Sequence, residues 1–190
     1  MKTVWVIGGP GCGKGTQCDR MIAKYGLLHL SSGDLLREEV ASGSPRGASL
    51  QEAMSKDLKK TNTRTQITSA GFLIDGYPRE LDQGLQFEKD VCPVDLVIFF
   101  DVANETLTKR LLGRAAVSQR ADDNEETIKK RIEIFNMKNG QIVEHYKDKV
   151  VRVRGSTIAY IFPEVIKAPR CIRFGVFRYY NVTALAVSGT

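Results

Sequence analysis

The feature that most constrains the fold is a glycine-rich segment near the N-terminus, between a short apolar run and an amphipathic pattern. The apolar run is Thr3-Val-Trp-Val-Ile7, and the glycine-rich segment is Gly8-Gly9-Pro10-Gly11-Cys12-Gly13-Lys14-Gly15-Thr16. After it, apolar side chains recur at i, i+3, i+4 and i+7 as far as Tyr25, and Gly26 follows directly. This order predicts a strand buried on both faces, a loop, and a helix that stops at a glycine.

A glycine-rich loop between a strand and a helix is typical of phosphate binding. Glycines let consecutive backbone N–H groups turn toward an anion, and the helix N-terminus adds a partial positive charge. Lys14 can reach terminal phosphates, whereas the hydroxyl of Thr16 comes one position later than in the strict pattern because Gly15 intervenes. Cys12 is either a small side chain that fits the loop or a redox-active thiol favoured by the helix N-terminus. The expected phosphate-loop residues are Gly9, Pro10, Gly11, Cys12, Gly13, Lys14, Gly15 and Thr16.

The rest of the chain alternates between strand and helix patterns. Further strands are expected at 27–30, 71–75, 94–101 and 149–153, with helical patterns at 79–90 and 104–112. A capping box at Asp123-Asn124-Glu125-Glu126 predicts a long helix. Its expected apolar face consists of Ile128, Ile132, Phe135, Ile142 and Tyr146. The alternation predicts an α/β fold with a largely parallel five-stranded sheet and helices on both faces. Such sheets bind ligands beyond the carboxyl ends of their strands.

Composition narrows the class of protein. With 190 residues, 42% of them hydrophobic, the chain is long enough for one ordinary domain and is neither disordered nor collagen-like. Four cysteines, at positions 12, 18, 92 and 171, fit neither a zinc spacing nor a secreted disulfide framework. They suit a reducing compartment, and the N-terminus contains no signal peptide or membrane span. The net charge of +6 requires an acidic partner, which is nucleic acid, a membrane or a small phosphate compound.

Four motifs in order along the chain resemble the nucleoside monophosphate kinase family. They occupy residues 8–17, 29–37, 71–79 and 120–131, and the similarity runs from about residue 2 to residue 156. The chain is most similar to the short cytosolic adenylate kinases. The resemblance implies a P-loop NTPase-type fold in residues 1–168, with a small acceptor-binding region at 31–70 and a short lid at 114–122. It also implies a monomeric cytoplasmic enzyme that uses Mg²⁺, ATP and AMP and binds neither nucleic acid nor membranes.

Several arginines are expected around the phosphates. A kinase that joins two nucleotides must hold two polyphosphates whose charges repel, and guanidinium groups stay charged when desolvated. The resemblance implies that Arg37 and Arg79 bind the acceptor phosphate, while Lys14 neutralises the donor. It also implies that three further arginines surround the transferred group. The expected catalytic residues are therefore Lys14, Arg114, Arg120 and Arg131, of which Arg114 also contacts ATP and the other two arginines also contact AMP.

Other polar residues are expected to serve the metal ion and the acceptor base. Asp75 ends the third strand, where it either holds Mg²⁺ through water or caps the turn at Gly76. Gln83 lies one helical turn beyond Arg79 and can both donate to and accept from an adenine edge. The resemblance implies AMP contacts from Ser32, Gly76 and Gln83. The resemblance also implies that Tyr77 favours AMP over UMP or CMP, whereas Ser32 leaves the preference open. His29 and His145 have no carboxylate or cysteine partner at catalytic spacing and are expected to be structural.

The sequence departs from the family pattern in three regions. Only 16 residues, Ser55–Ala70, separate Met54 from Gly71, so the acceptor-binding region is shortened. Ala115 and Gln119 occupy lid positions where relatives have glycine. The 22 residues 169–190 contain three arginines and no acidic residue, and they match nothing in the family. Two alternatives to an adenylate kinase therefore stay open, namely a UMP/CMP-type pyrimidine monophosphate kinase and an ATP-binding isoform with impaired transfer.

Overall fold

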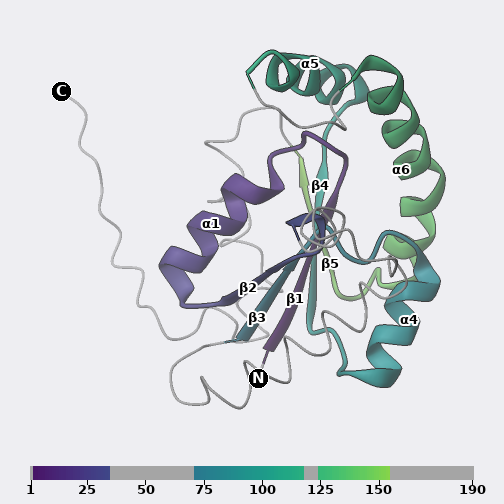
Figure 1. Ribbon diagram of the computed structural model, residues 1–190. Coiled ribbons are helices and arrows are strands. Elements are labelled where there is room, and N and C mark those ends of the chain that lie inside the picture. The colour runs from purple at the N-terminus through teal and green to yellow at the C-terminus, as the bar shows by residue number, and fades with distance from the viewer. Residues whose placement is uncertain (1, 35–70, 118–123, 155–190) are drawn as a thin grey trace, which may run out of the picture.

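The computed structural model describes residues 2–34, 71–117 and 124–154 and contains a five-stranded, entirely parallel sheet (Figure 1). The strands are β1 (Lys2–Gly8), β2 (Leu28–Ser31), β3 (Gly71–Asp75), β4 (Leu96–Asp101) and β5 (Val150–Arg154). Their order across the sheet is β2-β3-β1-β4-β5. The predicted parallel sheet is confirmed. Most of the acceptor-binding region, most of the lid and residues 169–190 lie outside the described residues.

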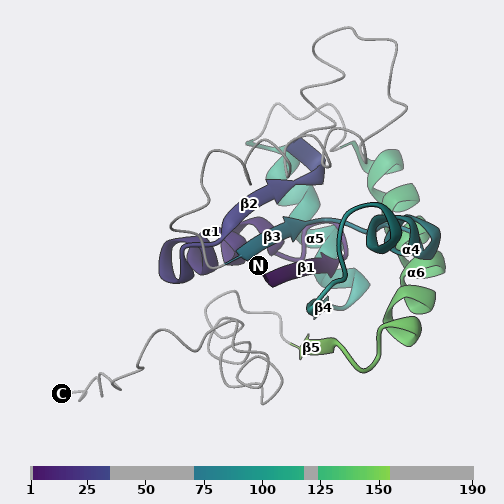
Figure 2. The same cartoon turned by 90° about the horizontal axis from the view of Figure 1, so that it is seen from below.

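Helices cover both faces of the sheet, as predicted. The described helices are α1 (Lys14–Tyr25), α4 (Leu81–Asp90), α5 (Asn104–Ala115) and α6 (Glu125–His145). α1 lies on one face, and α4 and α6 lie on the other (Figures 1 and 2). No helix within the described ranges combines the length and the apolar character that a membrane span requires.

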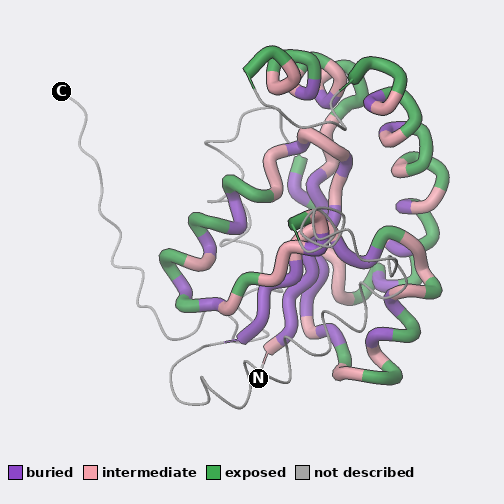
Figure 3. The backbone as a smooth tube through the Cα atoms, viewed as in Figure 1, coloured by how far each residue is buried: buried purple, intermediate pink, exposed green. Residues whose placement is uncertain are grey.

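The strand β1 explains why the sheet needs two layers of helices. Val4 and Val6 belong to the apolar cluster on the α1 side, whereas Trp5 and Ile7 belong to the cluster on the α4 and α6 side. All four side chains are at most 2% exposed, and Figure 3 shows the central strands as a buried block between the helices. Because successive side chains of a strand point to opposite faces, an uninterrupted apolar run must be buried on both.

The helix ends follow from local chemistry, with one correction. Gly26 has φ +62° and its N–H donates to the Ile22 carbonyl at 2.9 Å, which ends α1 at the predicted glycine. The predicted capping box at 123–126 is wrong by one residue. Asn124 is the N-cap of α6, and its side chain accepts from the Thr127 N–H at 2.9 Å. Asparagine caps a helix as well as aspartate does, so the sequence allowed both registers.

The strand order creates the crevice in which a ligand can bind. β1 lies between β3 and β4. From β1 the chain runs to β2 at the sheet edge and returns through β3, and then crosses to β4 on the other side of β1. The carboxyl ends of these parallel strands therefore meet at one edge, with Val6 of β1 paired to Asp75 of β3. A sheet of this type binds ligands where the strand order reverses, which here is directly beyond β1.

Candidate active site

A cavity of about 770 Å³ lies at this edge of the sheet and brings together most of the site residues expected from the sequence. It is lined by the phosphate loop, by the ends of β2 and β3, and by side chains of α5 and α6. The expected residues that line it are Pro10, Gly11, Gly13, Lys14, Gly15, Thr16, Ser32, Asp75, Gly76, Arg79, Arg114 and Arg131.

The remaining expected residues fall into two groups. Arg37 and Arg120 lie outside the described residues. Gly9, Cys12 and Gln83 are described but do not line the cavity. The Cys12 side chain is fully buried in the apolar core, which agrees with a small packed side chain in the loop rather than an accessible thiol. Within the loop, Gly9 packs against Leu107, and the Cys12 N–H donates to the Gly9 carbonyl at 3.2 Å.

The backbone of the phosphate loop is built to attract an anion. Gly11 and Gly13 have φ +78° and +97°, conformations that cost a side-chain-bearing residue about 1–2 kcal/mol. Gly13 is the N-cap of α1, no side chain caps this terminus, and its first turn carries no acidic residue. The Lys14 ammonium donates to the Gly8 and Gly9 carbonyls at 2.7 and 3.0 Å. The helix terminus and the lysine therefore place positive charge together in the loop.

The helix α5 both supports the loop and extends its positive charge. A β-carbon on Gly9 would lie 2.4 Å from Leu107, and one on Gly11 would lie 2.8 Å from Leu111, so the loop packs directly on this helix. Arg110 donates from Nη1 to the Cys12 carbonyl at 3.2 Å and lines the cavity. Arg110 is not among the site residues expected from the sequence. The sequence did offer a signal for it, because Arg110 lies one helical turn before Arg114 and shares a helix face with Leu107, Leu111 and Arg114.

The opposite side of the cavity is tied together by hydrogen bonds around Gly76. The Ser32 hydroxyl donates to the Gly76 carbonyl at 2.8 Å, and Arg79 Nε donates to the same oxygen at 3.5 Å. The Gly76 N–H donates to the Val6 carbonyl at 2.9 Å. Gln83 accepts from the Arg79 N–H through Oε1 at 2.9 Å. These bonds hold the residues that follow β2 and β3 next to the phosphate loop.

Asp75 supplies the carboxylate of the site. Burial raises the pKa of this carboxyl group, while the charges of Lys14 and His29 lower it. Its Oδ1 atom is buried and has no hydrogen-bond partner among the described residues. The alternative role as a cap of the turn is not observed, since the Gly76 N–H donates to Val6 instead. An orphaned carboxylate oxygen beside a phosphate loop fits a hydrated divalent cation.

No carboxylate or cysteine stands at catalytic spacing from His29 in the sequence, but the fold brings one of each close to it. A ring nitrogen of His29, the Cys18 sulfur and an Asp75 oxygen all lie within 4.8 Å of one another. The three residues come from β2, α1 and β3, and the sheet order, not sequence spacing, brings them together. His145 is not in this cluster and packs edge-on against Tyr146, with ring centroids 4.7 Å apart.

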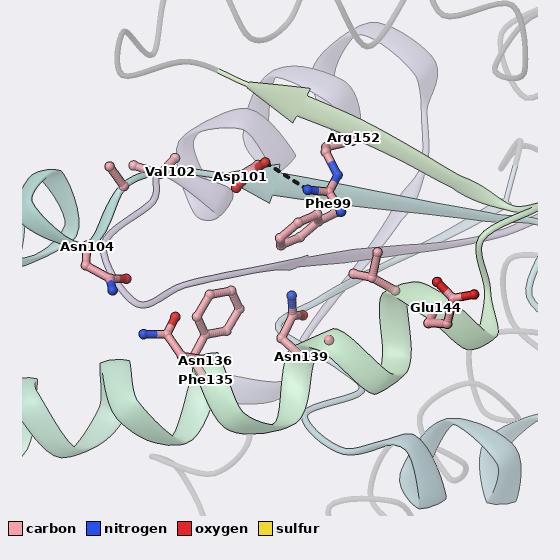
Figure 4. A pocket seen from close by; sticks show the side chains of 12 residues that line it. Phe99, Asp101, Val102, Asn104, Phe135, Asn136, Asn139, Glu144 and Arg152 are labelled. Carbon is pink, nitrogen blue, oxygen red and sulfur yellow. Dashed lines mark hydrogen bonds and ion pairs between the residues drawn. The ribbon is translucent and has the colours of Figure 1, made fainter.

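A second cavity, of about 470 Å³, lies between the ends of β4 and β5 and the helix α6 (Figure 4). Its charged groups are paired. Arg152 donates to Asp101 at 3.1 Å, and its guanidinium lies 5.2 Å from the centroid of the Phe99 ring. Glu144 accepts from Lys147 at 3.2 Å. Phe135 and Asn139 of α6 line both cavities. Asn139 is only 8% exposed, and the apolar periodicity of α6 did not indicate its burial. None of the site residues expected from the sequence lies in this second cavity.

The fold and the first cavity define a class of protein, the phosphate-loop nucleotide kinases. The phosphate loop follows the first strand, the Asp75 carboxylate lies at the end of β3, and arginines reach the cavity from α5, α6 and the segment after β3.

The comparisons with known proteins then identify the family. The family model described as adenylate kinase matches residues 6–151. The chain is 52% identical over 177 residues to "Adenylate kinase isoenzyme 1" of Caenorhabditis elegans, covering 85% of this chain and 84% of the relative. It is 49% identical over 178 residues to "Adenylate kinase 1" of Schistosoma mansoni, covering 86% of this chain and 90% of the relative. It is 46% identical over 178 residues to "Adenylate kinase isoenzyme 1" of Gallus gallus, covering 86% of this chain and 92% of the relative. The chain belongs to the adenylate kinase family and is a nucleoside monophosphate kinase, a phosphotransferase.

Proposed function

We propose that this chain catalyses the reversible, Mg²⁺-dependent transfer of the γ-phosphoryl group of ATP to AMP, giving two ADP. The observation that carries the proposal is one cavity in which a phosphate loop faces Arg79, Arg110, Arg114 and Arg131. Two nucleotide phosphate chains placed end to end repel each other, so they need cationic groups from several directions. The names of the relatives support ATP and AMP as the pair.

The donor nucleotide is assigned to the phosphate loop. The backbone N–H groups of Gly11 and of residues 13–16, together with the Lys14 ammonium, would bind the β- and γ-phosphates of ATP. Arg110 and Arg114 would continue the positive lining along α5, so we add Arg110 to the ATP-binding residues. A bound Mg²⁺ would neutralise donor phosphate oxygens, and Asp75 would hold it through water.

The acceptor nucleotide is assigned to the side of the cavity formed by Ser32, Gly76 and Arg79, with Arg37 as a further phosphate ligand. Gln83 would read the base. Its Oε1 accepts from the Arg79 N–H, so its Nε2 group can donate to a ring nitrogen of adenine. Gln83 would then link the base and phosphate of AMP through Arg79.

In the transfer step, a phosphate oxygen of AMP attacks the γ-phosphorus of ATP as the bond to the β–γ bridging oxygen breaks. Arg114, Arg120 and Arg131 would neutralise the charge on the equatorial oxygens of the transferred group. Closure of the lid at 114–122 would exclude water and prevent hydrolysis of ATP.

One specific observation favours the alternative of an ATP-binding isoform with impaired phosphoryl transfer. The segment Ser55–Ala70 is short, and the alignment with the C. elegans relative spans 177 residues while covering only 85% of the 190 residues here. The relative therefore contains residues without a counterpart in this chain. If these residues complete the acceptor site, ATP binds normally and AMP binds weakly.

A coupled assay that measures ADP formation from ATP with AMP, UMP or CMP tests these assignments. We expect AMP to be the fastest acceptor and Lys14→Ala to lower the rate of ADP formation about 10²–10³-fold. Faster turnover with UMP or CMP would favour the pyrimidine kinase. Calorimetry that detects ATP binding but no AMP binding, with ADP formation no higher than that of Lys14→Ala, would favour the ATP-binding isoform.

We also propose that the chain acts as a cytoplasmic monomer without affinity for nucleic acid or membranes. The basic segment 169–190 is the part of the chain that most needs testing, because it carries three arginines and no acidic residue. Retention on heparin should be unchanged when residues 169–190 are deleted, and a monomer is expected in size-exclusion chromatography. A marked loss of retention after the deletion would indicate a polyanion-binding tail.

A further inference from the structure

Three metal-ligating side chains converge beside the phosphate loop. The Cys18 sulfur, a His29 ring nitrogen and an Asp75 carboxylate oxygen all lie within 4.8 Å of one another. The arrangement follows from the sheet, since β2 pairs with β3 in a register that sets Ser31 opposite Asp75. The three donors therefore sit on three separate elements of the packed fold, not on one mobile loop.

The burial of the three groups suits an internal ion that is reached from the cavity. Cys18 is fully buried, and the Oδ1 atom of Asp75 is buried without a hydrogen-bond partner among the described residues. His29 is exposed and lines the first cavity, so it stands on the side from which an ion would enter. The orphaned carboxylate oxygen is an unmet acceptor that a cation would satisfy.

The chemical nature of the three metal-ligating side chains indicates which cation they would bind. Sulfur, imidazole nitrogen and carboxylate oxygen together suit Zn²⁺, which binds such ligands at about 2.0–2.3 Å in a tetrahedral arrangement. Mg²⁺ prefers oxygen ligands and keeps its waters, so the thiol and the imidazole are poor partners for it. In a tetrahedral site, neighbouring ligand atoms are about 3.3–3.8 Å apart, so atoms within 4.8 Å of one another need to approach by about 1 Å.

We propose that Cys18, His29 and Asp75 form a site for Zn²⁺, with water in the fourth position. On binding, the thiol proton of Cys18 passes to solvent as the zinc–sulfur bond forms. Zinc bound there uses the Asp75 carboxylate that the proposed kinase mechanism assigns to hydrated Mg²⁺. Zinc and Mg²⁺ then compete for Asp75, and zinc inhibits phosphoryl transfer. Zinc binding does not rest on the proposed function, whereas the inhibition does.

Binding is tested on the full chain, freed of metal by a chelator, with Zn²⁺ in calorimetry and Co²⁺ as a spectroscopic probe. We expect one Zn²⁺ per chain, and a sulfur-to-cobalt charge-transfer band that Zn²⁺ abolishes. Cys18→Ala should remove the band, and both Cys18→Ala and His29→Gln should weaken zinc binding at least about tenfold, because each removes one of three ligands. Cys92→Ala and His145→Gln are matched controls outside the cluster and should leave binding unchanged.

The outcomes separate the site from other zinc-binding groups. Absence of stoichiometric binding, or unchanged affinity in both Cys18→Ala and His29→Gln, would overturn the site. His29 is exposed, so His29→Gln tests the site even if Cys18→Ala unfolds, as circular dichroism would show.

Inhibition is tested by ADP formation at rising zinc with fixed ATP, AMP and Mg²⁺. Zinc should inhibit the natural chain, and Cys18→Ala should retain the basal rate while shifting the inhibitory zinc concentration upward about tenfold. Equal inhibition of the natural chain and Cys18→Ala would overturn the competition for Asp75. A chain that binds zinc at the site but forms no ADP would overturn the proposed function and leave the zinc site standing.

Discussion

The donor side of the cavity, formed by residues 8–16 and α5, is fixed by backbone shape and apolar packing, whereas the acceptor side around Gly76 is fixed by single hydrogen bonds. On the donor side, Gly9 and Gly11 approach Leu107 and Leu111 so closely that neither has room for a β-carbon. On the acceptor side, the Ser32 hydroxyl and Arg79 Nε donate to one carbonyl, that of Gly76.

This difference determines how each side tolerates substitution. A packed loop moves as a unit, so one added methyl group displaces several N–H groups that face the phosphates. A side-chain hydrogen bond contributes only about 1 kcal/mol and can be replaced by another polar group. We therefore expect changes on the donor side to reduce activity with every acceptor, and changes on the acceptor side to alter which acceptor is used.

The largest effect is expected from Lys14→Ala. Removing one preorganised cationic group from the transferred phosphate costs about 10²–10³-fold in kcat. The loss should be the same with AMP, UMP and CMP, because Lys14 belongs to the donor side. Lys24→Ala is the control, since Lys24 is exposed in the last turn of the same helix. Steady-state rates that differ by less than about fivefold between the two variants would contradict the role of Lys14.

A pair of arginine variants tests whether the two sides are functionally distinct. Arg110→Ala should raise the KM for ATP about 10–100-fold, the usual range for a lost charged hydrogen bond, and leave the KM for AMP unchanged. Arg79→Ala should do the reverse. Lys109→Ala is the control, because Lys109 is exposed on α5 and does not line the cavity. Initial rates with each substrate varied in turn measure both constants. If each arginine variant raises both KM values equally, the division into two sides fails.

Two glycine variants test the packing of the donor side. Gly11→Ala combines a φ of +78° with a contact of 2.8 Å to Leu111, so it should destabilise the fold by about 2 kcal/mol and weaken ATP binding. Gly113→Ala meets no atom within 4 Å inside α5, and it should stabilise the fold by about 0.5–1 kcal/mol. Urea unfolding and ATP calorimetry give both quantities. Normal stability and ATP affinity in Gly11→Ala would show that the loop accommodates a side chain.

The strands and the end of α1 could be predicted from the sequence because they depend on local residue patterns. After Thr3, the run to Ile7 contains only apolar residues, so the strand must be buried on both faces. All five expected strands form within two residues of their predicted ends. The stop of α1 at Gly26 is equally local, since a positive φ suits glycine. Local patterns left the register of the α6 cap undetermined, because Asp123 and Asn124 are both good N-cap residues.

The site was less predictable because it depends on contacts between distant segments. Glycines and Lys14 of the phosphate loop form a continuous motif, so they could be identified from spacing alone. Arg110 reaches the loop only because α5 packs on it, and the contact spans 98 residues. His29 meets Cys18 and Asp75 because β2 pairs with β3, which no spacing in the sequence reveals.

The smallest effect is expected on the acceptor side, from Tyr77→Phe. The Tyr77 hydroxyl donates to the Gln83 carbonyl at 2.7 Å, and burial raises the pKa of this phenol to about 12, so it remains a neutral donor at physiological pH. Losing this bond while the ring still packs against Trp5 should cost about 1 kcal/mol, or a fall in Tm of about 2–4 °C.

Because Gln83 is the residue proposed to read the base, Tyr77→Phe should also raise the KM for AMP about 2–3-fold and leave the KM for ATP unchanged. Thermal unfolding and initial rates with AMP and UMP measure these effects. The control is Gln86→Ala, an exposed position on the same helix whose side chain donates only to Asp90 among the described contacts. An unchanged Tm together with an unchanged preference for AMP over UMP would mean that the acceptor side does not depend on this hydrogen bond. The proposed difference between a donor side fixed by packing and an acceptor side fixed by hydrogen bonds would then be wrong at this position.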